Sequence, residues 1–385
     1  MPDIVIVHAM RTPIGRRGGW LRDHHPVQLG SLTLNALLER VPIDPTLIDH
    51  VIMGCVSQVA EQTFNLARNV VLDAGLPVET AATTIDFQCG SSQQALHLAA
   101  GMIASGQAEV VIAGGVESMT RTPLGSSLPT DGRSPFTDRI MTDHNIIGQG
   151  AAADEIAQRW QVTRAVVDQI GYDSHRKAAQ AAAQGVFQRE FFPITGVDDK
   201  GEAISVTSDE GVRPNANLEK MAALQSAFTP KGVTTAGNSS QISDGAAALL
   251  VMSAEKAEAL HLSPRARLVS MVTVGSDPHL MLTGPVAATR KVLARAGLTM
   301  DDIDLFEVNE AFAAVIAMWH RDMKAPMEKI NVYGGAIALG HPLGASGARL
   351  MTTLINALEL GNKRYGLQTM CCGGGMATAT IIERL

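Results

Sequence analysis

The sequence predicts an α/β protein built from two similar halves, with a segment of different character inserted between them. Its 385 residues exceed the length that one hydrophobic core usually serves, so two domains or two halves are expected. Hydrophobic residues make up 46% of the chain, charged residues 18% and aromatic residues only 4%, and there are 36 glycines. This composition is typical of a compact soluble enzyme in which small residues let helices lie close to sheets.

The N-terminal half begins with a buried strand and contains a strand–helix–strand unit. Residues 1–7 read as the first strand, and residues 82–86 read as a later one. A helix then runs from Cys89 to about Gly106, and a strand over 110–115 ends in two glycines. The apolar positions of that helix follow helical spacing, namely Ala95, Leu98, Ala99, Met102 and Ile103.

The C-terminal half repeats this plan. His341 follows a glycine-rich stretch, 331–335, and the next helix ends near Gly361, before a strand that ends at Cys371. One face of that helix carries Met351, Leu354, Ile355 and Leu358.

The stretches that precede these two units are also alike. Residues 47–55 stand before Cys89 as residues 302–309 stand before His341. Chance similarity between α/β units is the alternative explanation. If the halves are a duplication, each forms a sheet covered by helices, and the loops at equivalent strand ends meet at one shared site.

The segment between the halves has a different composition. Proline, glycine, serine and aspartate cluster over 124–138, and irregular turns are expected over 198–217. Helical patterns over 151–160 and 163–184 make the segment more than a linker, and we expect it to cover the site. The predicted domains are an N-terminal half, an inserted covering domain and a C-terminal half: 1–118 completed by about 244–263, 119–243, and 264–385.

The charge and the cysteine content exclude several classes of protein. A net charge of −7 gives no general attraction to nucleic acid or to an anionic membrane surface. No apolar run is long enough to span a bilayer, and a strand begins where a secretory signal would lie. Four cysteines in so long a chain do not make a disulfide framework, and they lack the paired spacing of a zinc site. We therefore expect a cytoplasmic protein without a metal site.

Cys89 stands where a strand gives way to a helix, a position that can make a cysteine nucleophilic. The first N–H groups of a helix are unpaired and carry the positive end of the helix dipole. They favour the thiolate over the thiol and can hold a developing oxyanion. A buried packing cysteine is the usual alternative for a free cysteine.

Three further segments accompany Cys89. They are Asn309-Glu310-Ala311-Phe312, the glycine-rich residues 334–344 around His341, and Cys371-Cys372-Gly373-Gly374-Gly375. In their order and spacing they make the chain resemble the thiolases, that is, β-ketoacyl-CoA thiolases and acetyl-CoA acetyltransferases, from Arg11 to the C-terminus. The resemblance implies a thiolase fold, in which two βαβαβ-type halves pack in five layers, α-β-α-β-α, with an inserted loop domain.

The resemblance also implies a role for each residue of the set. Cys89 corresponds to the nucleophile that becomes acylated, and His341 corresponds to the base that takes its proton. Cys371 corresponds to the acid or base at the α-carbon of the acetyl unit. Asn309 corresponds to the asparagine that holds a water in one oxyanion hole, and the N–H groups of Cys89 and Gly373 would form the other. A loop histidine beside a proline can equally be structural.

For the coenzyme, residues 236–245 resemble the segment that contacts pantetheine. Ser240 stands at the position whose hydroxyl contacts the pantetheine amide. Phe228 and Arg213 also match, and the resemblance implies that Arg213 lies near the adenosine diphosphate part, although a solvated arginine is the commoner outcome at a loop position. Coenzyme A would be a substrate, and neither a metal nor a redox cofactor is expected.

Two departures from the family pattern concern the acyl group. Residues 147–150 read Ile-Gly-Gln-Gly where short-chain acetoacetyl-CoA thiolases carry a His-Met-Gly segment, which predicts a different acyl pocket. Gln88 before the nucleophile, with Gln93 and Gln94 after it, is similar to the pattern of degradative thiolases that act on bulky or sterol-derived acyl-CoAs.

The resemblance therefore predicts a 3-ketoacyl-CoA thiolase that works by ping-pong kinetics through acyl-Cys89, in fatty-acid or sterol-type catabolism. Its products would be acetyl-CoA or propionyl-CoA and a shortened acyl-CoA. Three alternatives stay open: a biosynthetic acetyl-CoA acetyltransferase, a decarboxylating ketosynthase, against which Cys371 argues, and a non-catalytic acyl-CoA-binding protein. The resemblance also implies a homodimer or homotetramer, with residues 62–71 at the dimer interface.

Overall fold

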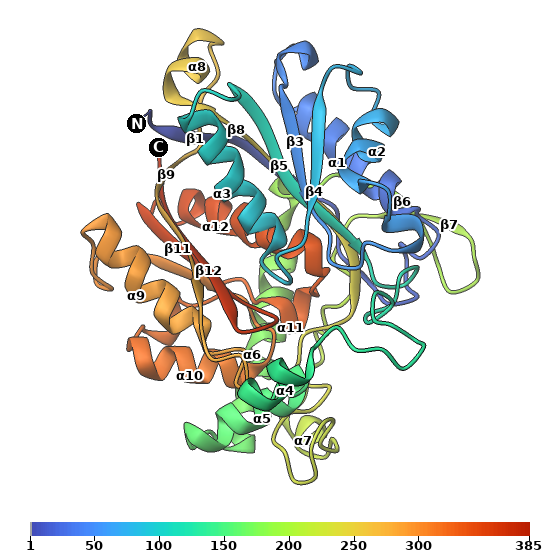
Figure 1. Cartoon of the computed structure of the whole chain (residues 1–385), viewed down its shortest axis with the longest axis vertical. Coiled ribbons are helices and arrows are strands. Elements are labelled where there is room, and N and C mark those ends of the chain that lie inside the picture. The colour runs from blue at the N-terminus through green and yellow to red at the C-terminus, as the bar shows by residue number, and fades with distance from the viewer. Residues whose placement is uncertain (1) are drawn as a thin grey trace.

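The computed structural model describes residues 2–385 and contains one half-sheet from each half of the chain (Figure 1). In the N-terminal half-sheet the order is β4-β3-β5-β8-β1, with β3 parallel to β4 and β5, and β8 antiparallel to β5 and β1. The short β2 pairs with the start of β8. The bounds are β1 Ile4–Arg11, β2 Gly15–Arg16, β3 His50–Gly54, β4 Ala81–Ile85, β5 Val110–Ser118 and β8 Ser243–Ser253.

The C-terminal half-sheet repeats this arrangement. Its order is β10-β11-β12-β9, with β10 parallel to β11, and β12 antiparallel to both its neighbours. A parallel bridge from Phe306 to Ile330 lies where β4 would stand in the other half. The strands are β9 Ala266–Gly275, β10 Leu305–Val308, β11 Tyr365–Cys372 and β12 Met376–Arg384. The same sequence of strands in both halves supports a duplication.

The two half-sheets are joined at one end. Val5 and Ile6 of β1 pair with Arg267 and Ala266 of β9, so that hydrogen bonds run through both half-sheets in one continuous path. The sequence patterns do not indicate this junction, because each strand reads only as buried.

Helices form three layers around the half-sheets. α1 (Pro26–Glu39) and α2 (Leu66–Asp73) cover the outer face of the N-terminal half-sheet, and α9 (Gly284–Ala296) covers the outer face of the C-terminal one with α10 (Ala313–Met323) beside it. α3 (Ser91–Ala104) and α12 (Ser346–Leu360) pack together between the two half-sheets. The predicted five-layer α-β-α-β-α fold is confirmed.

The central position of α12 explains its composition. Every residue from Ser346 to Leu358 is buried, because the helix is enclosed by a half-sheet on either side and by α3. Burial of its apolar side chains, at about 1.5–3 kcal/mol for each large one, fixes this helix in the middle of the protein. The loop that precedes α12 and carries His341 is therefore held on a rigid base.

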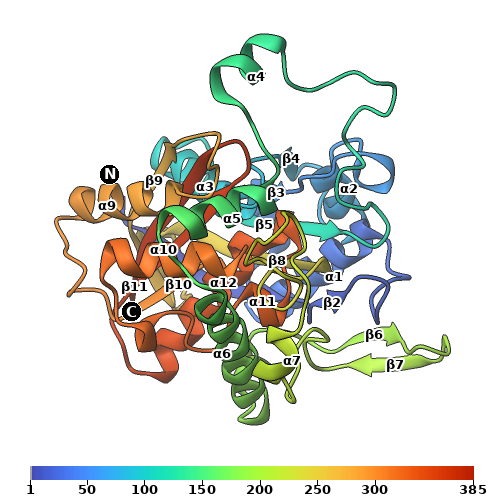
Figure 2. The ribbon, with the colours of Figure 1, turned by 90° about the horizontal axis from the view of Figure 1, so that it is seen from below.

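The segment between β5 and β8 contains the helices expected at 151–160 and 163–184. These are α5 (Gln149–Arg159) and α6 (Arg164–Ala183). The region expected to form irregular turns contains part of a hairpin, which projects from the side of the molecule, while α4 stands away from the body (Figure 2). The remaining elements are α4 Asp138–His144, β6 Ile194–Val197, β7 Ala203–Val206, α7 Leu218–Ala222, α8 Ala254–Ala259, which follows β8, and α11 Ala336–Leu339.

A buried ion cluster fixes this segment to the core. Arg11, at the end of β1, donates from Nε to Glu190 at 2.7 Å and from both Nη atoms to Asp209 at 2.7 and 3.0 Å. All three side chains are buried. Removing one partner from such a cluster would leave a buried charge with neither its ion-pair partner nor water, which is strongly destabilising. The cluster therefore fixes the inserted segment to the core.

Within residues 2–385, no helix is both long and apolar enough to cross a membrane.

Candidate active site

Cys89 lies in a tight turn between β4 and α3. Gln88 has φ +50°, in the left-handed region that a side chain rarely adopts, and its carbonyl accepts from the Ser91 N–H and hydroxyl at 3.0 and 2.6 Å. The Phe87 N–H in turn donates to Ser91 Oγ at 2.9 Å. This turn places Cys89 immediately before the first N–H groups of α3, as the sequence predicts.

Burial controls the ionisation of Cys89. It raises the pKa of the thiol to about 12, and the charges of Glu117 and Asp86 raise it further, against the N–H groups of Cys89 and Gly373 that lower it. The N–H groups at the helix start act in the expected direction, towards the thiolate. Burial outweighs them, because taking an anion out of water costs more free energy than these donors recover. Cys89 is a thiol at neutral pH and needs a base.

His341 is held in one orientation and one tautomer. Its backbone N–H donates to Gln241 O at 3.1 Å and Ser243 Oγ at 3.2 Å. The Ser346 hydroxyl donates to Pro342 O at 2.8 Å, so its oxygen accepts from His341 Nδ1, which lies 2.6 Å away. The proton is thus on Nδ1, and Nε2 carries the lone pair of a base.

The neighbours of His341 keep it neutral. Burial lowers the pKa of its imidazole to about 3, and the charge of Arg349 lowers it further. Asn309, which follows β10, donates from Nδ2 to Nε2 over 3.3 Å, and its own N–H is bound to Thr369 O at 3.0 Å. The sequence-predicted pair of Asn309 and His341 is therefore brought into contact, with the basic nitrogen between them.

Glycines allow the His341 loop to approach the N-terminal half. A Cβ on Gly344 would lie 2.5 Å from Gly54 O, and a Cβ on Gly115 would strike Gly344 O. Gly340 has φ +104°, and a Cβ there would meet Ser243 Oγ and Ile14. The glycine-rich sequence around His341 thus serves close contact between the two halves.

Cys371 and Gly373 lie beside Cys89. Cys371 is the penultimate residue of β11 and is buried. Burial raises the pKa of its thiol, and a negative charge on Cys89 raises it further. The ionisation of the two cysteines is therefore coupled. The Gly373 N–H acts on the Cys89 sulfur together with the N–H of Cys89 itself. The structure therefore places Cys371 and Gly373 beside Cys89, and Asn309 beside His341. Leu343, two residues after His341, belongs to the same buried cluster as Cys89.

Glu117, at the end of β5, is a site residue that the sequence analysis does not identify. Its buried carboxylate accepts the N–H groups of Val56 at 2.9 Å, Ser57 at 3.0 Å and Gly344 at 2.9 Å, and the amide of Gln62 at 2.9 Å. It thereby ties the loop after β3 to the loop of His341. A lone glutamate in the otherwise apolar run 110–117 is the only sequence signal that could have revealed it.

Two of the residues expected to contact the coenzyme lie close to one another. The N–H of Ser240 donates to Ala311 O at 3.0 Å, and Ser239 forms a bridge with Phe312. Phe228 packs edge-on against Phe312, with ring centroids 5.8 Å apart. Phe312 thus connects the Ser240 segment to Phe228, which is half exposed and available to a ligand.

Arg213 lies at a neighbouring cavity rather than beside these two residues. Its N–H donates to His175 Nδ1 at 3.2 Å, and it lines a cavity of about 430 Å³ together with His175, Lys220 and Gly237. Gly237 belongs to the same segment as Ser240. The cavity therefore combines two cationic side chains, Arg213 and Lys220, with the segment that carries Ser240. This arrangement suits a phosphate group.

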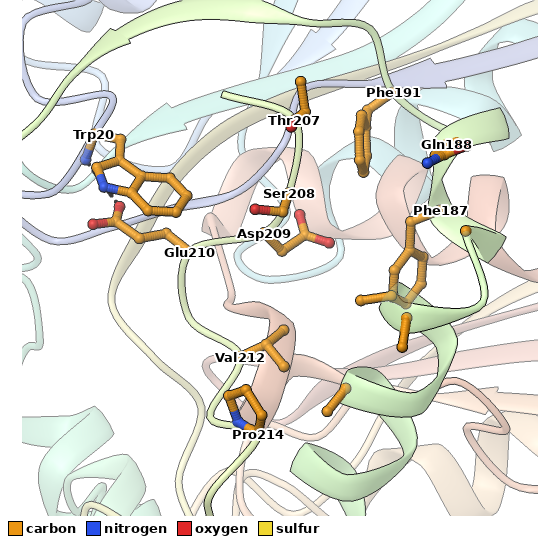
Figure 3. A pocket seen from close by; sticks show the side chains of 14 residues that line it. Trp20, Phe187, Gln188, Phe191, Thr207, Ser208, Asp209, Glu210, Val212 and Pro214 are labelled. Carbon is orange, nitrogen blue, oxygen red and sulfur yellow. Dashed lines mark hydrogen bonds between the residues drawn. The ribbon is translucent and has the colours of Figure 1, made fainter. Parts of the chain in front are cut away.

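A separate cavity of about 410 Å³ has no cysteine in its lining (Figure 3). Trp20 and Glu210 form one wall, Phe187 and Phe191 the opposite wall, and Asp209 points between them. Because Asp209 is already paired with Arg11, this cavity borders the ion cluster that fixes the inserted segment.

Comparison with known proteins shows the family of the chain. Residues 4–255 match the thiolase N-terminal domain, and residues 262–384 match the thiolase C-terminal domain. The chain belongs to the thiolase family. A 3-ketoacyl-CoA thiolase from Idiomarina loihiensis is 44% identical over the full length of both chains.

Other relatives of this thiolase carry related names. The steroid 3-ketoacyl-CoA thiolase FadA6 of Mycobacterium tuberculosis is 44% identical, over all of this chain and 95% of that protein. Among solved structures, the acetyl-CoA acetyltransferase of Bacillus anthracis superposes with a TM-score of 0.92 at 36% identity, covering all of this chain and 99% of that one. These matches extend over both halves and the segment between them.

Proposed function

We propose that this thiolase cleaves 3-ketoacyl-CoA with free CoA through a covalent acyl-Cys89 intermediate. The observation that carries the proposal is the protonation state of three groups, namely the imidazole of His341 and the thiols of Cys89 and Cys371. His341 has its lone pair on Nε2, while Cys89 and Cys371 are both neutral thiols that can give a proton. A base and two acids around one sulfur are what the reaction needs.

In the first half-reaction Cys89 is acylated. His341 Nε2 takes the proton from the Cys89 thiol, and the sulfur forms a bond to the keto carbon of the substrate. The bond between that carbon and the α-carbon then breaks, and its electron pair stays on the α-carbon as the enolate of acetyl-CoA. Cys371 gives its proton to that carbon, which leaves an imidazolium, a thiolate and the acyl-enzyme.

In the second half-reaction CoA removes the acyl group. The Cys371 thiolate takes the proton of the CoA thiol, and the CoA sulfur attacks the acyl carbon. The bond to the Cys89 sulfur breaks, and His341 returns its proton to that sulfur. Every proton is thus supplied within the site, so we propose that the reaction needs no cofactor other than its CoA substrates.

We assign two sets of donors to the substrate oxygens that become negative. The N–H groups of Cys89 and Gly373 lie at the sulfur, and Asn309 lies at the basic nitrogen of His341. Loss of one such donor typically costs about 2.7–4 kcal/mol of transition-state stabilisation. We assign Ser240 and Phe228 to the pantetheine chain, and Arg213 to the phosphates.

The degradative direction is supported by the names of the relatives, among them 3-ketoacyl-CoA thiolases and a steroid thiolase. We place the substrate in fatty-acid or sterol-type catabolism. The biosynthetic alternative uses the same groups in reverse, and Cys371 argues against a ketosynthase. The four cysteines are unpaired, which suits the reducing conditions of the cytoplasm, where we place the protein.

Steady-state kinetics test the proposal. Thiolysis should give parallel double-reciprocal lines as CoA is varied, should release acetyl-CoA or propionyl-CoA, and should vanish in Cys89→Ala. Cys55→Ala removes another buried cysteine and should retain activity. Intersecting lines, or activity that survives in Cys89→Ala, would rule out the acyl-Cys89 route.

We propose that the protein works as a homodimer formed through the β4 edge. β4 is the last strand of its half-sheet, and Phe64 nearby is 87% exposed, in a left-handed backbone conformation shared by Asn65. An exposed phenyl beside an open strand edge is typical of an interface. Light scattering should give twice or four times the monomer mass, 40.7 kDa, and Phe64→Asp should lower it; a monomeric wild type would contradict the proposal.

A further inference from the structure

The carboxylate of Glu310, the residue after Asn309, is buried and binds two segments of the chain at once. Its Oε2 accepts the N–H of Ile337 at 3.1 Å, and its Oε1 accepts from Nδ2 of Asn331 at 3.0 Å. Ile337 belongs to α11, the short helix that leads to His341. The carboxylate thus joins the turn after β10 to the beginning of the His341 loop.

Ser174, on α6 of the inserted segment, completes this arrangement. Its hydroxyl donates to Glu310 Oε2 at 2.6 Å, and the same oxygen of Ser174 accepts the N–H of Gly335 at 3.1 Å. The loop lies directly on α6 here, because Gly334 has φ +78° and a Cβ on it would lie 2.5 Å from the Ser174 carbonyl oxygen. The inserted segment therefore holds the beginning of the His341 loop directly.

Asn331 fixes the turn that carries Asn309. Its Oδ1 accepts the N–H of Val308 at 2.9 Å, and its Nδ2 donates to Val308 O at 2.8 Å as well as to Glu310. The N–H of Asn309 itself is bound to Thr369 O at 3.0 Å. The residues on both sides of Asn309 are thus held by one amide, which fixes the backbone of Asn309.

We propose that Glu310 and Ser174 are positioning residues that hold Asn309 and His341 at their contact distance. This inference rests on the proposed function. Asn309 and His341 belong to different segments, and Nδ2 of the first lies 3.3 Å from Nε2 of the second. Glu310 adjoins one segment in the chain and is hydrogen-bonded to the other. Because a displacement of about 1 Å can cost about a hundredfold in rate, these buried hydrogen bonds serve catalysis as well as stability.

An amide cannot take the place of the Glu310 carboxylate. The Asn331 amide presents N–H to Oε1, because its own oxygen is already bound to the N–H of Val308. Ile337 presents an N–H to Oε2. Either orientation of a glutamine side chain would set its NH₂ group against one of these donors. Glu310→Gln should therefore displace the loop, whereas Ser174→Ala removes only the hydroxyl that joins the loop and the carboxylate to α6.

The test measures the rate constant for acylation of Cys89 by acetoacetyl-CoA in single turnovers, with the number of sites that can be acylated counted by intact mass. Counting the sites removes the contribution of unfolded protein, so a purely structural role would leave the rate constant unchanged. The variants are Ser174→Ala, Glu310→Gln, both together, and Thr289→Ala. Thr289 is the matched control, because its buried hydroxyl accepts from Trp319 Nε1 at 2.9 Å in the outer helix layer.

The rate constant should fall about tenfold in Ser174→Ala and about a hundredfold in Glu310→Gln, with the wild-type value kept in Thr289→Ala. KM for CoA should change by less than about threefold, since binding of the coenzyme is not affected. The double variant should be within about threefold of Glu310→Gln, because two groups that act as one unit are not additive.

Wild-type rate constants in both single variants, or an equal loss in Thr289→Ala, would overturn the inference and leave the proposed function in place. If Glu310→Gln does not fold, the comparison of Ser174→Ala with Thr289→Ala decides. The absence of any acyl adduct in the wild type would overturn the proposed function, and the inference with it.

Discussion

Replacing Ser346 by alanine tests how the tautomer of His341 is set. The Ser346 oxygen is the acceptor of the Nδ1 proton, at 2.6 Å, and both residues are buried. Without the Ser346 hydroxyl, the imidazole either keeps an unpaired Nδ1–H or moves its proton to Nε2. In the second case Nε2 has no lone pair with which to accept the proton of Cys89.

The expected loss follows from the hydrogen bond removed. Leaving a buried donor unpaired costs about 1–3 kcal/mol, and each 1.4 kcal/mol is about tenfold in rate. We therefore predict that kcat falls roughly ten- to a hundredfold in Ser346→Ala. KM for the ketoacyl-CoA should change little, because Ser346 lies behind the imidazole, away from the residues assigned to CoA.

The assay is a single-turnover measurement of acylation by stopped flow, followed by steady-state kinetics. Thr352→Ala is the matched control, since Thr352 is on the same helix, is buried, and donates to a carbonyl four residues earlier, as Ser346 does. It should keep kcat within about twofold. Wild-type acylation in Ser346→Ala, or an equal loss in Thr352→Ala, would refute the role assigned to Ser346.

Four further predictions follow from the geometry. Glu117→Gln replaces an acceptor oxygen by an amide NH₂ that faces N–H donors. It should lower the free energy of unfolding, measured by urea titration, by roughly 2–4 kcal/mol and should also lower kcat. Unchanged values would contradict the role of Glu117 in joining the loop after β3 to the loop of His341. Gly340→Ala should lose most activity through a clash with Ser243, whereas Gly275→Ala, with no atom within 4 Å of its Cβ, should not. Because burial raises the pKa of Cys89 to about 12, its alkylation by iodoacetamide should keep accelerating above pH 8, and a plateau below pH 7 would contradict this. Burial lowers the pKa of His341 to about 3 and that of His97 to about 4. Below pH 6.5 the unfolded chain therefore binds more protons than the folded protein, so the melting temperature should fall as the pH is lowered from 6.5 to 4. The fall should be less steep in His97→Gln.

The sequence predicts the parts of this thiolase that depend on local pattern. The strand before Cys89, the helix after it, α12 and the two helices α5 and α6 all follow from hydrophobic spacing. The repeated order of strands is visible because each half preserves the same succession of elements.

Features that depend on contacts between distant segments could not be predicted in this way. Glu117 acquires its role only when the loop after β3 meets the loop of His341. The net ionisation of Cys89 could not be predicted either, because a helix start is visible in the sequence, whereas the burial that outweighs its N–H groups is not. The β6–β7 hairpin is short, so its strand pattern is weak.

The most direct test of the account is the intact mass of the protein after one turnover without free CoA. With acetoacetyl-CoA or a longer 3-ketoacyl-CoA, we predict one acyl adduct per chain, with a mass that follows the substrate, that is absent in Cys89→Ala and that is removed by adding CoA. No adduct from any 3-ketoacyl-CoA, or an adduct that persists in Cys89→Ala, would contradict the account. An adduct formed from a simple acyl-CoA that then condenses with malonyl-CoA would favour the ketosynthase instead.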